Sequence, residues 1–280
     1  MDHSIQFSLA HLTVLDLAPP AVARVAAEAG FDAFGLRLHP VLPGELAPPV
    51  FGDTPMRREL LAIIADTGVG MFDVEAFRLT RTSDFGPLHD TLEAAARFGA
   101  KHALVFIDES DRKLAADLLA RFTDIADQYG IAPSLEFMPW LGINSLAAAL
   151  DVIALASQSS VGLLLDCLHV CRTNTPVATL RDLDPALLHY AQVCDAPRLA
   201  PPTLDAIADE ARNRRMFPGE GELPIVEIVS ALPAQFVLAS EVATAGIAAG
   251  VSGLDRAQRA FKATQRIAEQ AEAGRAVDHH

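Results

Sequence analysis

The stretch Ser134-Leu-Glu-Phe-Met-Pro139 is a short apolar run in which Glu136 places a carboxylate at the end of an expected strand. Three later apolar runs have the same form, and each is of the kind that makes a buried parallel strand. The polar side chains that close them are Asp166, Gln192 and Glu241. Carboxylates are costly to bury unless they are paired or bind a metal. Four oxygen-bearing groups at one end of a sheet therefore indicate a divalent-cation site.

Apolar runs of this kind recur along the whole chain, with helix-like stretches between them. We expect strands near residues 5–9, 33–38, 69–75, 102–107, 131–137, 161–166, 188–194 and 235–241. This spacing is typical of βα units, and eight such units predict an α/β fold, a (β/α)8 TIM barrel in a single domain. We place the barrel over residues 1–275 and expect a mobile C-terminal tail over residues 276–280.

The composition narrows the class of protein. The chain has 280 residues, which suffices for one large domain, and 51% of them are hydrophobic, which excludes a disordered chain. A formal net charge of −14 and the lack of a basic stripe oppose binding to nucleic acid. No apolar run reaches the roughly 18–20 residues of a membrane-spanning helix, and the N-terminus lacks the basic region of a signal peptide. We therefore expect a cytoplasmic protein with neither a nucleic-acid nor a membrane partner.

Proline, glycine and asparagine mark the expected helix ends and loops. Pro19-Pro20 suits the first turn of a helix that Gly30 ends, and Asn144 is the expected N-cap of a later helix. Two long connections, residues 39–53 and 196–222, follow strand ends and are rich in proline. In a barrel, loops in this position form the rim of the active site.

The four strand-end groups have the chemistry of a metal site. Glu136, Asp166, Gln192 and Glu241 would come from the fifth to eighth strands and meet at one mouth of the barrel. Three carboxylates and an amide carbonyl are hard oxygen ligands, so we expect Mn²⁺ or Mg²⁺ ahead of Co²⁺ or Zn²⁺. Without a cation, repulsion among the carboxylates would raise their pKa values.

The order of these motifs resembles the xylose isomerase-like TIM barrel superfamily. This superfamily includes sugar-phosphate isomerases and epimerases, D-tagatose 3-epimerase, hydroxypyruvate isomerase, inosose dehydratase and endonuclease IV. The resemblance covers nearly the whole chain in architecture, but the specific motifs lie in its second half. They are Glu136, Asp166-x-x-His169, Gln192-x-x-Asp195-x-x-Arg198, Pro218-Gly-Glu-Gly-Glu222 and Glu241.

The resemblance implies an activity. Glu136 and Glu241 would bind the metal and also serve as the catalytic acid/base pair, while His169 and Arg198 would contact the substrate. The implied enzyme is a divalent-metal-dependent isomerase or epimerase of carbohydrate metabolism, acting on a small polyhydroxy ketone, sugar or sugar phosphate. It would abstract a proton next to a carbonyl through a metal-stabilised enediolate.

One residue departs from the family's pattern. The metal site of the family commonly has a histidine where this chain has Gln192. An amide oxygen is a weaker donor than imidazole, so we expect lower metal affinity and a preference shifted away from Zn²⁺. The departure also counts against endonuclease IV activity, which needs several histidines for a multi-zinc cluster.

Further polar and aromatic side chains follow other strands. Glu75 ends the third expected strand, His39 follows the second and Trp140 follows the fifth, so we expect all three to bind substrate. The alternative is that they belong to polar networks or loop anchors on the rim, and Arg37 and His11 have the same two interpretations. The chain has no GxGxxG or P-loop pattern, so we expect no nucleotide cofactor.

Cys167, Cys171 and Cys194 border the expected ligands without forming a Cys-x-x-Cys pair. We interpret them as small buried thiols of the core rather than zinc ligands.

Two other functions remain open from the sequence. The same first step followed by loss of a β-hydroxyl would make the protein a metal-dependent dehydratase of an inosose-like or dehydroshikimate-like ring. A different class is a non-catalytic sugar-binding barrel in which Gln192 marks the decay of the site. Homodimers or tetramers are common in the resembled family, so the resemblance also allows a homo-oligomer around a small carbohydrate-like ligand.

Overall fold

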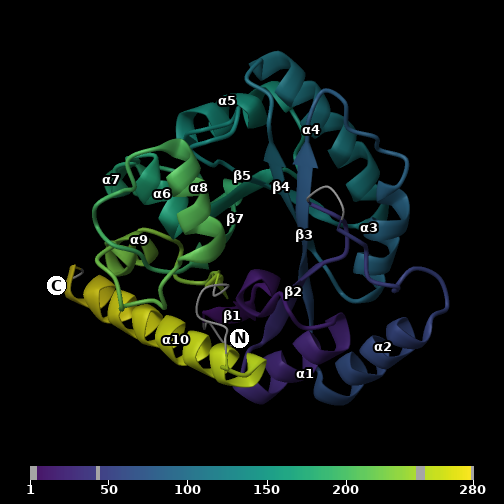
Figure 1. Cartoon of the computed structure of the whole chain (residues 1–280). Coiled ribbons are helices and arrows are strands. Elements are labelled where there is room, and N and C mark those ends of the chain that lie inside the picture. Colours follow the sequence, from purple (N-terminus) through teal and green to yellow (C-terminus); the bar gives the residue numbers. More distant parts are fainter. Residues whose placement is uncertain (1–4, 42–44, 244–249, 279–280) are drawn as a thin grey trace.

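The chain folds into a closed barrel of eight parallel strands surrounded by helices (Figure 1). The structure is a computed structural model that describes residues 5–41, 45–243 and 250–278, and of residues 276–278 it describes the backbone alone. The strands are β1 (Gln6–Leu9), β2 (Ala33–Arg37), β3 (Gly70–Leu79), β4 (His102–Ile107), β5 (Ala132–Glu136), β6 (Gly162–Asp166), β7 (Leu188–Val193) and β8 (Val237–Ser240). The predicted (β/α)8 TIM barrel in one domain is confirmed.

Helices connect the strands on the outside of the barrel. They are α1 (Pro19–Ala29), α2 (Pro55–Thr67), α3 (Leu88–Arg97), α4 (Arg112–Ala126), α5 (Leu146–Ala156), α6 (Cys167–Arg172), α7 (Val177–Arg181), α8 (Leu204–Asn213), α9 (Ile225–Ser230) and α10 (Gly253–Asp278). The long α10 packs against α1 and α9, beside the pairing of β1 with β8 that closes the barrel (Figure 1). In the described part of the chain, no helix combines the length and the apolar character that crossing a bilayer requires.

Each strand begins within two residues of its expected start, because a buried apolar run is a strong local signal. β3 is longer than expected, because it ends at Leu79, whereas the sequence predicted an end near residue 75. Along the residues expected to form the tail, α10 continues to Asp278, and residues 279 and 280 lie outside the described part. The prediction of Asn144 as a helix cap was wrong: Ser145 caps α5, because its Oγ accepts a hydrogen bond from the backbone N–H of Ala148 at 3.2 Å.

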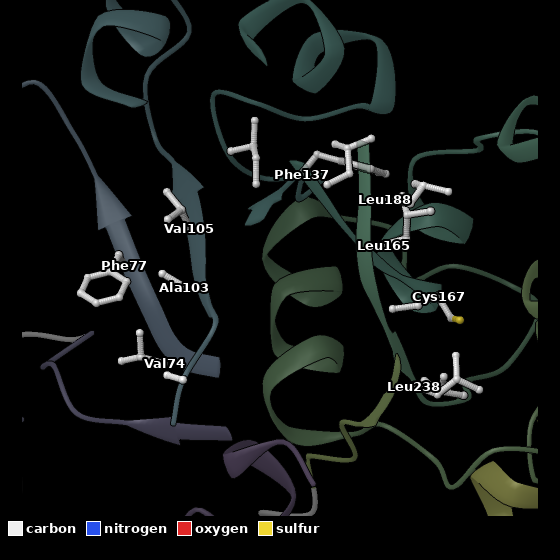
Figure 2. Packing of buried hydrophobic residues seen from close by; sticks show 14 of the residues in the cluster. Val74, Phe77, Ala103, Val105, Phe137, Leu165, Cys167, Leu188 and Leu238 are labelled. Atoms are coloured by element: carbon white, nitrogen blue, oxygen red, sulfur yellow. The ribbon is translucent and has the colours of Figure 1, made fainter. Parts of the chain in front are cut away.

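The side chains of each strand alternate between its two faces and so form two separate hydrophobic cores. On β4, Leu104 and Phe106 point into the barrel, where they join a small inner cluster. Ala103 and Val105 point outward into the larger core between the strands and the helices (Figure 2). The same period of two decides which polar groups of the other strands face the barrel interior, and it positions the candidate site.

Candidate functional site

A cavity of about 470 Å³ opens at the carboxyl end of the strands. Five of the residues expected in the site line it, and they come from four different strands or the loops behind them. They are Glu75, Glu136, Trp140, His169 and Glu241. Loops and apolar residues of the inner cluster, such as Phe106 and Met138, complete the wall. The parallel strands thus bring side chains from distant parts of the sequence to one mouth.

The four expected metal ligands lie at neighbouring strand ends. β5 ends at Glu136, β6 ends at Asp166, and Glu241 directly follows β8. The register of β6 and β7 pairs Asp166 with Gln192, so their side chains project from the same face. All four residues are at most 4% exposed. Burial of three carboxylates within one arc requires compensating positive charge or bound protons.

Arg215 supplies part of this positive charge. Its Nη1 lies 2.5 Å from Asp166 Oδ2 and its Nη2 lies 3.0 Å from Glu241 Oε2, with the guanidinium itself buried. Gln192 Nε2 donates a hydrogen bond to the other oxygen of Glu241 at 2.9 Å. One guanidinium and one amide therefore connect the ends of β6, β7 and β8.

Asp166 also positions the expected substrate-binding histidine. Its Oδ1 accepts the backbone N–H of His169 at 3.0 Å and so caps the N-terminus of α6. This cap places His169 Nε2 3.5 Å from Glu136 Oε1. Donor atoms of Glu136, Asp166 and His169 all lie within 4.8 Å of one another, a spacing at which three side chains can share a metal ion.

Burial and mutual repulsion shift the protonation of these groups. Burial raises the pKa of Glu136 well above its usual range, and the negative charges of Asp166 and Glu241 raise it further. Burial, and Asp166 after it, raise the pKa of Glu241 to about 8 against the opposing effect of Arg215. Burial alone would also raise the pKa of Asp166, but Arg215 and His169 together bring it below its usual value. Burial lowers the pKa of His169 to about 4, so the imidazole is neutral near pH 7.

The residues present fit a divalent cation. Among the described residues, Arg215 makes ion pairs with two of the three carboxylates, Asp166 and Glu241, so its single positive charge offsets only one of the three formal negative charges, and bound protons or a cation must offset the other two. Buried Gln192 Oε1 has no hydrogen-bond partner in the described part of the chain, which leaves a hard oxygen donor free. Glu136, Asp166, Gln192 and Glu241 could hold the ion, and His169 offers a further donor at its edge.

The structure does not bring Arg198 into the cavity. Its side chain is exposed, and its backbone N–H donates to Glu222 at 3.2 Å on the outer loop. Arg215 lies in the site instead, although the sequence pattern did not predict it as a site residue. Its available signal was its position three residues before Pro218, in the segment that resembles the family's loop.

Asp195 explains why Arg215 reaches the site and Arg198 does not. Its two carboxylate oxygens accept backbone N–H groups from Ala196, Gly219, Gly221 and Leu223, and it forms an isolated bridge with Met216. These bonds fold the segment after Arg215 back onto the end of β7. Asp195 is therefore a structural anchor, and the connection after it carries Arg198 outside the cavity before its later part returns, so that Arg212 and Arg215 line the cavity.

Of the remaining expected residues, Trp140 lines the cavity, whereas His39 and His11 do not. Trp140 lies edge-on to His169 with ring centroids 5.1 Å apart, and the guanidinium of Arg212 lies 5.8 Å from its ring centre. His39 instead stacks on Phe77 at 5.6 Å, outside the residues that line the cavity. His11 lies beneath the rim, where its Nδ1 accepts the backbone N–H of Arg37.

Comparisons with known proteins agree with this architecture. A family model described as xylose isomerase-like TIM barrel matches residues 23–270. The 3-dehydroshikimate dehydratase of Pseudomonas aeruginosa is 26% identical over 230 residues, which are 78% of this chain and 34% of that protein. The inosose isomerase of Bacillus subtilis is 26% identical over 128 residues, or 45% of this chain and 44% of that protein. The chain thus matches less than half the length of these curated relatives.

Solved structures share the fold at low identity. A xylose isomerase-like TIM barrel/4-hydroxyphenylpyruvate dioxygenase fusion protein superposes with a TM-score of 0.81 and 19% identity, over 99% of this chain and 44% of that one. The IolI protein with a bound zinc atom superposes with a TM-score of 0.79 and 18% identity, over 95% and 99% of the two chains.

Proposed function

Because the chain belongs to the family of xylose isomerase-like TIM barrels, we propose that it is a metal-dependent enzyme that removes a proton next to a carbonyl group. The substrate is a small hydroxylated ketone of carbohydrate-like chemistry. The observation that carries this proposal is the convergence of Glu136 and Glu241 on one cavity, with Asp166 and Gln192 buried beside them. Proton abstraction at carbon needs both a base and a group that stabilises the charge developing on oxygen.

Glu136, Asp166, Gln192 and Glu241 would hold Mn²⁺ or Mg²⁺ through oxygen atoms. When bound, the metal would act as a Lewis acid towards the carbonyl oxygen of the substrate. Arg215 stabilises the negative charge of Asp166 and Glu241 and so orients both side chains.

Glu136 and Glu241 are the proposed acid/base pair. They come from β5 and from the end of β8, and both line the cavity. Their raised pKa values suit proton exchange near neutral pH, since a general base works best with a pKa near the working pH. Because His169 is neutral near pH 7, it would bind a substrate oxygen without adding positive charge to the site.

Dehydration is the outcome that the comparisons favour. The match to 3-dehydroshikimate dehydratase extends over 78% of the chain, and Arg37, Arg78 and Arg212 line the cavity. Guanidinium groups suit a substrate that carries a carboxylate. The reaction would remove the proton next to the ketone of a dehydroshikimate-like ring and release a β-hydroxyl as water.

Isomerisation or epimerisation is the second candidate. The similarity to inosose isomerase supports it, and so does the presence of two glutamates that can each exchange a proton with the substrate. The two outcomes share their first step and differ in whether a hydroxyl leaves.

Product mass separates these outcomes. Protein stripped with EDTA and reloaded with Mn²⁺ is incubated in D₂O with 3-dehydroshikimate or with an inosose. A product lighter by one water identifies the dehydratase. A product that has gained deuterium but has lost no water identifies the isomerase. We expect Glu136→Gln to slow turnover by about 10²- to 10⁴-fold. Metal-loaded protein that neither turns over these compounds nor exchanges their hydrogens would contradict the proposal and leave a sugar-binding barrel.

A further inference from the structure

A second pair of carboxylates lies inside the barrel on β3. Asp73 and Glu75 are two residues apart on the strand, so both project from its inner face, and each is only 1% exposed. Val74 between them points outward into the larger core (Figure 2). Glu75 reaches the cavity wall, which Glu136 and Glu241 also line, whereas Asp73 lies deeper.

Each carboxylate of this pair has one satisfied and one unsatisfied oxygen. Glu75 Oε1 accepts the backbone N–H of His11 at 3.1 Å, and Asp73 Oδ2 accepts the hydroxyl of Tyr190 at 2.8 Å. Within the described part of the chain, the buried Glu75 Oε2 and Asp73 Oδ1 have no hydrogen-bond partner. A buried oxygen left in this way is costly for a carboxylate, whereas a protonated carboxyl group can offer a donor to a ligand.

The surroundings hold the two groups close together. The register pairs Arg37 with Glu75, and a Cβ atom at Gly35 would overlap both Glu75 Oε1 and Asp73 Oδ1. The absent side chain of Gly35 is therefore what makes room for two acids side by side. Among the described residues no ion pair joins Arg37 to either carboxylate, so the pair is not neutralised by direct contact.

Burial raises the pKa of Glu75 to about 8, and the charge of Asp73 adds to the shift against Arg37 and the His11 hydrogen bond. Burial likewise raises the pKa of Asp73 to about 7, although the Tyr190 hydroxyl opposes it and Glu241 adds to it. Near neutral pH, Glu75 thus presents a proton towards the cavity from the β3 side of the barrel.

We propose that Glu75 is a further catalytic residue, the acid that protonates the departing hydroxyl oxygen of the substrate. The inference rests on the proposed dehydration and assigns the proton donor that this reaction needs. The base first takes the proton from the carbon next to the ketone, and the C–H electron pair is held as an enolate; in the elimination step this pair forms the new C=C bond. The C–O bond breaks with its electrons on oxygen, and the proton of Glu75 Oε2 joins that oxygen to form water. Glu75 is left as a carboxylate, and exchange with solvent then resets both groups.

Asp73 is a positioning residue in this proposal. It does not line the cavity, and its effect on the reaction passes through Glu75. Its charge favours the protonated form of Glu75, and the Tyr190 hydroxyl fixes one of its oxygens. Asp73→Asn should therefore move the pH above which activity is lost to a lower value, without a matching change in KM.

The main test uses Glu75→Gln, which keeps the shape of the side chain but has no acidic proton. With 3-dehydroshikimate in D₂O we expect water loss to slow by about 10²-fold or more, as for loss of a general acid. Deuterium exchange next to the carbonyl should continue within a few-fold of the unchanged protein, because proton abstraction precedes departure of the hydroxyl. Equal loss of exchange and water release, or full retention of water release, would overturn the assignment.

If the unchanged protein does not turn over 3-dehydroshikimate, the proposed function is contradicted. The protonation of Glu75 is then tested separately by infrared spectroscopy. Infrared spectra of metal-loaded protein with ¹³C-labelled glutamate carboxyl groups should show a protonated carboxyl band near neutral pH that Glu75→Gln removes. The control is Glu109→Gln, since the backbone hydrogen bond from Asp111, followed by the hydrogen bond from Arg81, lowers the pKa of Glu109, which is ionised. Identical bands in Glu75→Gln and the unchanged protein would refute a protonated Glu75.

Discussion

Arg215 and Asp166 form a buried ion pair at the mouth of the barrel, with Nη1 and Oδ2 2.5 Å apart and both side chains at most 3% exposed. The same guanidinium contacts Glu241, so a residue of the β7–α9 connection joins the ends of two strands. The negative charges of Asp166 and Glu241 raise the pKa of Arg215 despite its burial. Arg215 is therefore charged, and the site keeps a permanent cation whether or not a metal is bound.

Replacing Arg215 with alanine should destabilise the metal-free protein strongly. The change leaves Asp166 and Glu241 buried without their partner, and breaking a buried pair in this way typically costs about 3–5 kcal/mol. Added Mn²⁺ should restore part of the loss, because a divalent cation at the carboxylates compensates the same charge. The measurement is urea unfolding with EDTA and with excess Mn²⁺.

Arg214→Ala is the matched control for this prediction. Arg214 is the preceding residue, and its pair with Asp209 is about half exposed on both sides, so it should contribute only about 0.2–1 kcal/mol. Equal losses of stability in the two variants would show that the buried pair contributes no more than an exposed one.

Gln192→His should change which metal the protein prefers. Gln192 Oε1 is a free buried oxygen donor, whereas an imidazole nitrogen suits Zn²⁺ better than Mg²⁺ or Mn²⁺. The metal content of protein equilibrated with equal amounts of Zn²⁺ and Mn²⁺ should shift towards zinc in the variant. Gln192→Leu, which offers no donor, should bind less of both. An unchanged zinc-to-manganese ratio in Gln192→His would argue against this residue as a ligand.

The fold was readable from the sequence because each strand carries its own signal. Apolar runs with polar closures marked the ends of β5 and β6 within one residue, and parallel topology then brought Glu136 and Asp166 to one mouth. These inferences need only local pattern and one rule about barrels.

The rest of the site depends on contacts that residue spacing does not record. Arg198 and Arg215 lie in the same long connection, and which of them enters the mouth depends on how Asp195 folds the segment back. Asp73 was missed because it lies inside β3, and only its bond with Tyr190 and the gap at Gly35 show its role. Long-range packing decides both cases.

Metal binding should release protons near neutral pH. The pKa of Glu241 is raised to about 8 and that of Glu136 is raised well above its usual range, so both carry protons in part without metal. A cation must displace these protons, and its affinity should therefore rise as the pH increases from about 6 to about 8. Calorimetry of Mn²⁺ binding in buffers of different ionisation enthalpy measures the number of protons released, and a heat independent of the buffer would contradict the prediction.

A histidine pair at the opposite end of the barrel should govern stability in acid. His102 on β4 and His189 on β7 have ring centroids 4.7 Å apart, and the Nδ1 atoms of both contact Ser134 Oγ, at 3.3 Å and 2.8 Å. Burial lowers the pKa of His102 to about 3, and the charge of His189 lowers it further. Burial also lowers the pKa of His189 to about 4. Both rings are therefore neutral in the folded protein over most of the acidic range.

The stability that depends on these rings should fall as the pH decreases. In the unfolded chain both histidines titrate near 6.5, so below that pH the unfolded state binds more protons than the folded state. The free energy of unfolding should then decrease from about pH 6.5 towards about pH 4. His102→Phe, which can pack on the neighbouring Phe72, removes one titrating ring and should reduce this slope in urea unfolding series. His89→Phe is the control, since His89 is only partly buried and its Nδ1 contacts the hydroxyl of Tyr129 at 3.0 Å, and an equal change of slope in both variants would contradict the assignment.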